Sequence, residues 1–140
     1  MHNLLILDGA MGTMLQAAGM KAGEHPEVFG FDNPDIVKNI HLKYIEAGSN
    51  IIYANTFGAN AHKLEGCKID VDTAIKTAIQ SAKEAVAESK RDVKVALDIG
   101  PIGELLEPLG VLRFEDAYDI YKEMVVAGEK YGADIIVFET

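Results

Sequence analysis

Four short runs of apolar residues recur along this sequence, and each has the length of a β-strand. They cover residues 4–7, 51–54, 93–99 and 134–138 and are rich in leucine, isoleucine and valine. Continuous apolar runs of this length are typical of strands that are buried on both faces of a parallel sheet. The pattern therefore predicts four buried strands.

Between these runs, apolar residues recur with the spacing of amphipathic helices. We expect three main helices, at about residues 34–47, 71–90 and 115–131, and a further short helix from about 12 to 18. The alternation of strands and helices predicts an α/β fold in which a parallel sheet is linked by right-handed crossovers.

The ends of two of these helices carry specific signals. Asn33 followed by Pro34 is typical of a helix start, with the asparagine as N-cap and the proline in the first turn. Gly48 and Gly132 follow the first and third main helices, where glycine commonly ends a helix. These signals fix the expected boundaries more closely than periodicity alone.

The connections differ in length between the two ends of the predicted sheet. Each helix returns to the next strand through two or three residues, whereas long connections follow the strands, at about residues 8–33, 55–70 and 100–114. In parallel α/β proteins the ligand binds at the carboxyl ends of the strands, where the loops are elaborated. We expect the chemistry of this protein at that end.

The composition excludes several classes of partner. The 22 acidic and 13 basic residues give a net charge of -9, and the basic residues are scattered, which argues against nucleic acid and anionic membranes as partners. No apolar run approaches the roughly 20 residues needed to cross a bilayer. The single cysteine, Cys67, excludes an intrachain disulfide and favours a cytoplasmic location. No linker divides the chain, so one domain is expected.

Polar residues follow the predicted strands at the end where a ligand is expected. Asp8 follows the first strand, Asn55 and Thr56 follow the second, Asp98 lies near the end of the third, and Glu139 follows the fourth. Carboxylates suit the capture of a ligand amine, and glycines let backbone N–H groups approach a ligand carboxylate. An amino acid would suit such a site, although Asp8 could equally cap the helix that follows it. The neighbouring glycines are Gly9, Gly12, Gly58, Gly100 and Gly103.

Four motifs contain these residues: DGAMGTMLQ at 8–16, NTFGAN at 55–60, DIGPIG at 98–103 and GADIIVFET at 132–140. In this order and spacing they resemble the homocysteine S-methyltransferase family, with the closest likeness to the homocysteine-binding module of cobalamin-dependent methionine synthases. The resemblance covers the whole chain. It implies that residues 1–140 are the amino-terminal half of a (β/α)8 TIM barrel, ending after the fourth strand.

The resemblance also implies a chemistry. In the family, three cysteine thiolates hold a zinc ion that binds the homocysteine sulfur, and the resulting thiolate takes a methyl group to give methionine. The implied methyl donor is methylcobalamin, recharged from methyltetrahydrofolate by other modules. The residues matching the family's homocysteine-binding positions are Asp8 and Glu139, which are expected to hold the amine, and Gly9, Ala10, Thr56 and Asp98, which are expected to line the same mouth.

The zinc ligands are where this sequence departs from the family pattern. The family's three cysteines lie on later strands, beyond Thr140, and a complete barrel needs about 250 residues. Cys67 lies in the loop after the second predicted strand and matches none of them. We therefore expect no metal ligand and no catalytic residue in this chain, and no activity or bound cofactor when it is alone.

Several alternatives remain open at this point. The chain could bind homocysteine only with the carboxyl-terminal half of the barrel, or it could self-associate so that a second copy takes the place of that half. It could instead be a non-catalytic half-barrel binding module, or a truncation or gene-model artefact. A rearranged, open flavodoxin-like sheet is also compatible with the pattern.

Overall fold

The computed structural model describes residues 4–139 and contains a three-stranded parallel sheet. Its strands, β1 (Ile51–Tyr53), β2 (Lys94–Ile99) and β3 (Ile135–Phe138), lie side by side in chain order. Ile52 is opposite Val95, and Leu97 is opposite Ile136. The predicted parallel α/β fold is confirmed, and the sequential strand order excludes the rearranged flavodoxin-like sheet.

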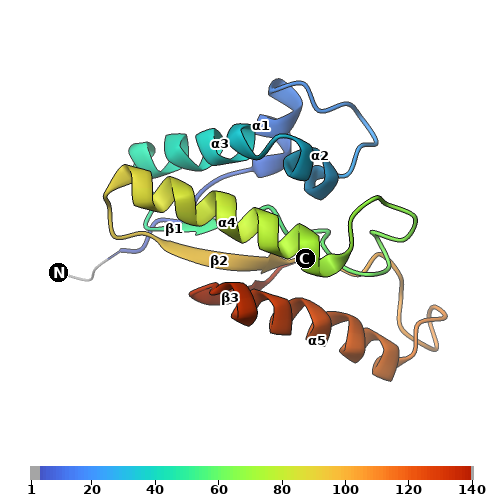
Figure 1. The fold of residues 1–140 in the computed structure, drawn as a ribbon. Helices are drawn as coiled ribbons and strands as arrows, with labels where there is room; N and C mark the ends of the chain where they lie inside the picture. The colour runs from blue at the N-terminus through green and yellow to red at the C-terminus, as the bar shows by residue number, and fades with distance from the viewer. Residues whose placement is uncertain (1–3, 140) are drawn as a thin grey trace.

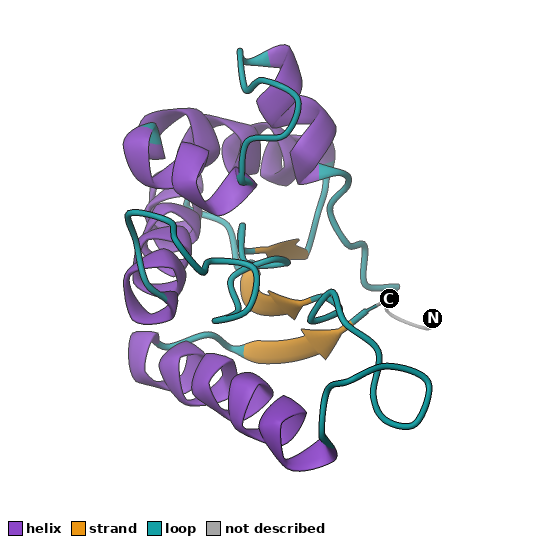
Figure 2. Cartoon of the chain, turned by 90° about the vertical axis from the view of Figure 1, so that its right-hand side faces the viewer, coloured by secondary structure: helices purple, strands orange, loops and turns teal. Residues whose placement is uncertain are grey.

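Residues 4–139 also form five helices. The three longest, α3, α4 and α5, pack beside one another on one face of it (Figures 1 and 2). The predicted helices are all present, with boundaries within about one residue of those expected. Their bounds are α1 (Met11–Ala17), α2 (Pro26–Asp32), α3 (Pro34–Ala47), α4 (Val71–Ser89) and α5 (Phe114–Tyr131).

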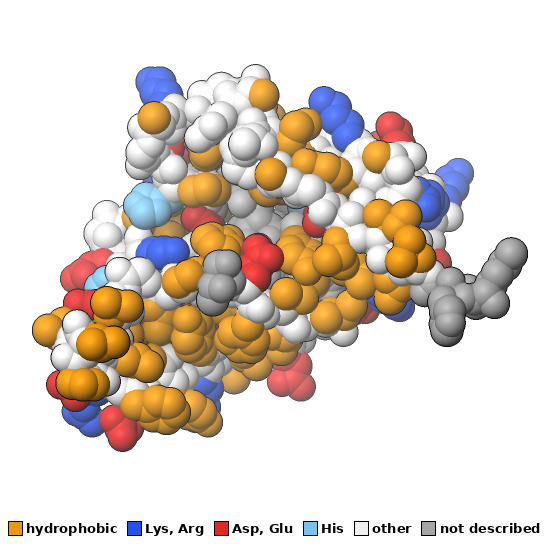
Figure 3. All heavy atoms as spheres, turned by 180° about the vertical axis from the view of Figure 1, so that it is seen from behind, with side chains coloured by type: hydrophobic (Ala, Val, Ile, Leu, Met, Phe, Trp, Pro, Cys, Tyr) orange, Lys and Arg blue, Asp and Glu red, His pale blue; other side chains and the backbone are white. Residues whose placement is uncertain are grey.

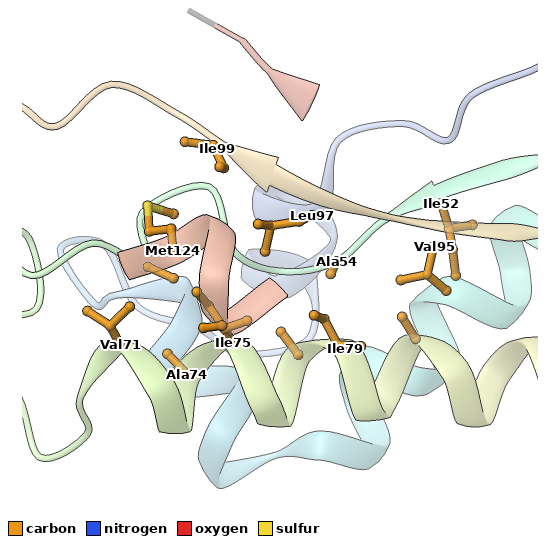
Figure 4. Close-up of a cluster of buried hydrophobic side chains, with 14 of the residues drawn as sticks. Ile52, Ala54, Val71, Ala74, Ile75, Ile79, Val95, Leu97, Ile99 and Met124 are labelled. Carbon is orange, nitrogen blue, oxygen red and sulfur yellow. The ribbon is translucent and has the colours of Figure 1, made fainter. Parts of the chain in front are cut away.

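The main core lies between these helices and the sheet. Alternate side chains of β2, including Val95 and Leu97, point toward Ile75 and Ile79 of α4 (Figure 4). All four are at most 2% exposed. Because alternate residues of a strand face opposite sides, Asp98 lies on the face of the sheet away from α4. Because Val95 and Leu97 are packed against α4, the β2 residues that alternate with them, including Asp98, face away from the helices.

The helix ends follow local rules. Gly48 and Gly132 end α3 and α5 in the left-handed conformation, with φ of 118° and 79°, which confirms both predicted stops. Asn33 occupies the N-cap position of α3, but its side chain makes no capping hydrogen bond and instead donates from Nδ2 to the Phe29 carbonyl at 2.9 Å. Its predicted capping role is therefore wrong, because Asn33 directly follows α2, and its backbone N–H and side chain both donate to the Phe29 carbonyl in the last turn of that helix.

The start of α4 provides a test of helix capping. Asp70 accepts a hydrogen bond from the Thr73 backbone N–H at 2.8 Å. Asp70→Ala is expected to lower the free energy of unfolding by about 1 kcal/mol, because that N–H then has no partner in the helix. Urea denaturation measures the change. Asp92→Ala, at an exposed side chain, is the matched control, and equal effects of the two variants would contradict the capping role.

The prediction of a regular first strand is wrong. Residues 4–7 form only an isolated parallel bridge, between Leu7 and Ile51. The ladder is interrupted because the Asn50 side chain, through Oδ1, accepts from the Ile6 N–H at 3.0 Å in place of a backbone carbonyl. The segment nonetheless runs along β1, since the Ile6 carbonyl accepts from the Asn50 N–H at 2.7 Å.

A second difference is α2, a helix that was not predicted and that lies in the long connection of residues 8–33. It has seven residues, with Pro26 in the first turn and Gly30 in its middle. A helix this short has no complete apolar repeat for periodicity to detect. Its position proves important, because it forms one wall of the cavity described below.

One side of the molecule exposes many hydrophobic side chains. Leu4 and Leu5 are 81% and 65% exposed, and Phe138 on the open edge of the sheet is 60% exposed. Figure 3 shows such side chains gathered in a broad band on the side opposite that of Figure 1. Among residues 4–139, no helix is long and apolar enough to cross a membrane. Thr140 lies outside the described residues.

Candidate functional site

A cavity of about 570 Å³ opens at the carboxyl ends of the strands, at the end where the sequence predicted the chemistry. It is bounded by the segments that follow residues 4–7, β1 and β3, by Asp98 near the end of β2, and by the start of α2. The six predicted site residues come from four different motifs, three of them from the first motif, and the fold brings them all together. The six that line the cavity are Asp8, Gly9, Ala10, Thr56, Asp98 and Glu139.

Asp8 is held by the neighbouring strand. Its Oδ2 accepts a hydrogen bond from the Tyr53 backbone N–H at 3.0 Å. The next helix, α1, has Ala10 at its N-cap position and no side-chain cap. The alternative in which Asp8 caps that helix is therefore wrong, and its carboxylate lines the cavity instead.

Thr56 and Asp98 link the loop after β1 to the end of β2. The Thr56 hydroxyl donates to the Asp98 carbonyl at 2.8 Å and accepts from the Asp98 backbone N–H at 3.0 Å. Thr56 is fully buried, so its hydroxyl is committed to this link. Thr56 therefore positions the Asp98 backbone at the cavity wall.

The carboxyl groups in the cavity disfavour one another's ionisation. Burial raises the pKa of Asp98 from 3.8 to about 7, and the charges of Glu139, Asp8 and Glu27 raise it further. Burial also raises the pKa of Asp8 to about 6, against the opposing effect of the hydrogen bond from Tyr53, with a smaller contribution from Glu139. A cation placed among these groups would favour their charged forms and so lower the pKa of both Asp8 and Asp98.

The raised pKa of Asp98 predicts a gain in stability when its charge is removed. Between about pH 4 and 7 the Asp98 carboxyl group loses its proton in the unfolded chain but keeps it in the folded chain, so Asp98 lowers the stability of the folded state as the pH rises. The shift would correspond to about 4 kcal/mol in a site closed to water, and solvent screening at the open mouth reduces it to about 1–2 kcal/mol. Asp98→Asn should therefore stabilise the protein by that amount at pH 8.

Thermal and urea unfolding at two pH values measure this effect. At pH 4 the variant and the wild type should be nearly equal, because the wild-type carboxyl is protonated in the folded state. Asp92→Asn, at a side chain that is 96% exposed, is the control and should change little at either pH. A gain at pH 4 as large as that at pH 8 would show that charge is not the cause.

Two glycines near the cavity, Gly58 and Gly100, allow close packing but offer no free backbone N–H to a ligand. The Gly58 N–H donates to Glu27 Oε1 at 2.6 Å, and the Gly100 N–H donates to the Phe57 carbonyl at 3.1 Å. The expectation that these two bind a ligand carboxylate is therefore wrong, since both donors are engaged. A Cβ at Gly100 would lie 2.6 Å from the Phe57 ring, so glycine permits close packing there.

Two charged residues in the cavity wall were not anticipated from the sequence. Glu27 lies in α2 and is 4% exposed, and Lys63 reaches the cavity from the loop after β1. The Lys63 Nζ lies 5.2 Å from the centre of the Phe57 ring, which places its charge beside the mouth. Neither residue belongs to a distinctive motif, so sequence pattern gave no signal for them.

The residues of this chain do not supply the zinc site that the family implies. Cys67 is the single cysteine of the sequence, and it lies outside the cavity, in the loop after β1. Within residues 4–139, no three histidine, cysteine or acidic side chains are arranged to hold a metal ion. A three-thiolate site cannot be built from one thiol.

Comparison with known proteins agrees with this geometry. The sequence profile of the homocysteine S-methyltransferase family matches residues 5–140. The chain belongs to that family. Two curated methionine synthases, from Mycobacterium tuberculosis and Mycobacterium leprae, are 30% and 31% identical to it over 99% of its length.

Solved structures with a similar fold include the homocysteine methyltransferase MmuM from Escherichia coli. Its metallated form superposes with a TM-score of 0.84 at 23% identity, over 99% of this chain and 54% of that one. Its apo form gives a TM-score of 0.71 at 24% identity. The chain thus has the fold of about half of a homocysteine methyltransferase barrel, and it spans 12% of the length of the two methionine synthases.

Proposed function

We propose that this chain forms the amino-acid-binding half of a homocysteine S-methyltransferase barrel. The observation that carries the proposal is the gathering of Asp8, Asp98 and Glu139 around one cavity at the carboxyl ends of the strands. Family membership makes homocysteine the substrate that fits this site. Its ammonium group lies among the carboxylates, and Lys63 offers a positive charge for its carboxylate.

The division of labour follows from the residue types. Asp8 and Glu139 bind the amine, while Gly9 and Ala10 line the same mouth. Thr56 holds the Asp98 backbone in place. Zinc, which the family uses to activate the homocysteine sulfur, requires thiolates that this chain does not have. The thiol is therefore activated by residues outside these 140 positions.

The methyl donor in this proposal is methylcobalamin, recharged from methyltetrahydrofolate by other modules. Support comes from the motif resemblance to cobalamin-dependent methionine synthases and from the identity to two methionine synthases along the whole chain. The product is methionine. An alternative role as a non-catalytic half-barrel would share the same cavity but would never assemble a zinc site.

The exposed hydrophobic band suggests how the catalytic half would join. In the proposal, a carboxyl-terminal barrel half covers the apolar side chains of residues 4–7 and β3, since the chain matches only 54% of the MmuM structure. Burial of this surface would favour association. Self-association of two copies would cover the same surface. Light scattering of the purified chain measures its mass and so shows whether it is a monomer or a dimer.

A ligand titration tests the proposed site in the chain itself. Homocysteine and 4-sulfanylbutanoate, the same molecule without the amine, are titrated into the isotope-labelled chain and followed by NMR. The proposal predicts that homocysteine shifts the carboxyl resonances of Asp8, Asp98 and Glu139 and binds at least about 10-fold more tightly than the amine-free compound. Equal affinities, or no binding of homocysteine, would contradict it.

A further inference from the structure

Glu27 is a buried acid in the cavity wall that the roles described above leave unexplained. It is the second residue of α2, and only 4% of its surface is exposed. Its Oε1 accepts the Gly58 N–H at 2.6 Å. Its Oε2 is buried and has no hydrogen-bond partner among the described residues.

The link to Gly58 accounts for an acceptor at this position, but it does not account for a charge. The loop after β1 needs one oxygen for the Gly58 N–H, and the amide oxygen of a glutamine would supply it equally well. A buried carboxylate oxygen without a partner is unfavourable, and each such group in a folded protein requires an explanation. The second oxygen of Glu27 therefore indicates a partner that is not part of the chain.

The surroundings hold this carboxylate in one place. Next to it, the Asn55 side chain donates from Nδ2 to the Pro26 carbonyl at 2.8 Å. Glycines allow the two segments to approach closely, because a Cβ at Gly58 would lie 2.9 Å from Glu27 Oε1 and one at Gly30 would lie 2.8 Å from Asn55 Nδ2. A group positioned in this way binds without first being ordered.

The position of Asp98 indicates which ligand group Glu27 would meet. Asp98 is influenced by the charges of Glu139, Asp8 and Glu27, so it lies within the electrostatic range of all three. A cation beside Asp98 would therefore be attracted by Glu27 as well. An ammonium group also has three N–H donors that point in different directions, so it can donate to more than one carboxylate.

We propose that Glu27 is a further amine-binding residue, which accepts a hydrogen bond from the ligand ammonium through Oε2 while Oε1 holds the Gly58 loop. This inference rests on the proposed function and extends it, because it assigns part of the selectivity for amine-bearing ligands to α2. Glu27 would thus combine a positioning contact and a ligand contact in one side chain.

Glu27→Gln separates the two contacts. The glutamine oxygen keeps the Gly58 hydrogen bond, and the amide replaces the free acceptor by a donor. In the NMR titration, the variant should bind homocysteine at least about 10-fold more weakly and 4-sulfanylbutanoate within about 2-fold of the wild type. Glu65→Gln, at an exposed loop position, is the matched control and should change neither affinity.

The outcomes distinguish this inference from the proposed function. If the wild type prefers homocysteine and Glu27→Gln keeps that preference, or loses affinity for both ligands equally, the role of Glu27 is refuted and the proposed function stands. If the wild type shows no preference for the amine, both fail. Should the variant not fold, the Glu27 ¹³Cδ resonance of the wild type decides: homocysteine should shift it and 4-sulfanylbutanoate should not, and no shift with homocysteine overturns the proposal.

Discussion

Glu139→Gln and Asp8→Asn are each expected to weaken homocysteine binding by about 30-fold or more in a reconstituted barrel, in which this chain is combined with a carboxyl-terminal half. Removing one charged partner of an enclosed ion pair typically costs about 2–5 kcal/mol. Each replacement keeps the size of the side chain and removes only its charge. The Asp8 variant also keeps an oxygen for the Tyr53 N–H, so the local backbone should stay in place.

Calorimetric titration of the reconstituted barrel with homocysteine measures these losses. Glu129→Gln, at an exposed position of α5, is the matched control for the glutamate and should bind like the wild type. The loss should be much smaller for 4-sulfanylbutanoate, which has no amine to hold. Unchanged homocysteine affinity in both variants would refute the assignment of these two carboxylates.

Reconstitution itself is the second prediction with a large expected effect. Mixing the chain with a carboxyl-terminal half that carries the three zinc cysteines should produce a complex that binds one zinc ion and methylates homocysteine. The expected change is from no measurable turnover to measurable turnover with methylcobalamin as donor. Metal analysis after gel filtration and a methionine assay detect the two gains.

A carboxyl-terminal half whose three cysteines are replaced by alanine is the matched control for this experiment. It should still associate, because the hydrophobic surfaces are unchanged, but it should bind no zinc and form no methionine. Turnover with the alanine half would contradict the proposed division between an amine-binding half and a sulfur-activating half.

The longer elements of this fold were predictable because each carries its own local signal. The helices α3, α4 and α5 have apolar stripes, and two of them end at glycines with positive φ. Residues 4–7 have the composition of a buried strand, yet they are exposed and make one bridge. Apolar composition indicates that a segment suits a buried strand, but regular strand pairing also depends on the neighbouring segment. Here the Asn50 side chain takes the place of a backbone acceptor for the Ile6 N–H.

The candidate site was predictable in outline for a different reason. Parallel strands bring their carboxyl ends to one edge, so Asp8, Asp98 and Glu139 could be placed together from their positions at or directly after the ends of the strands. Glu27 could not be placed, because a single acid in a short helix has no periodic or motif signal. Its burial in the cavity wall and its contact with Gly58 are known only from the structure.

The pH dependence also required the structure. Strand-end spacing places Asp98 in the mouth, but the rise of its pKa to about 7 depends on burial and on three neighbouring acids. One of those acids is Glu27, which sequence did not place there. The electrostatic character of the site is therefore a property of the assembled cavity.

Metal content and turnover of the purified 140-residue chain, measured without any added partner, test the central claim most directly. The claim is that this chain holds the amino acid by its amine and leaves sulfur activation to residues elsewhere. The predicted result is no tightly held zinc and no methionine formed from homocysteine with methylcobalamin. One retained zinc ion per chain together with methionine formation would contradict it.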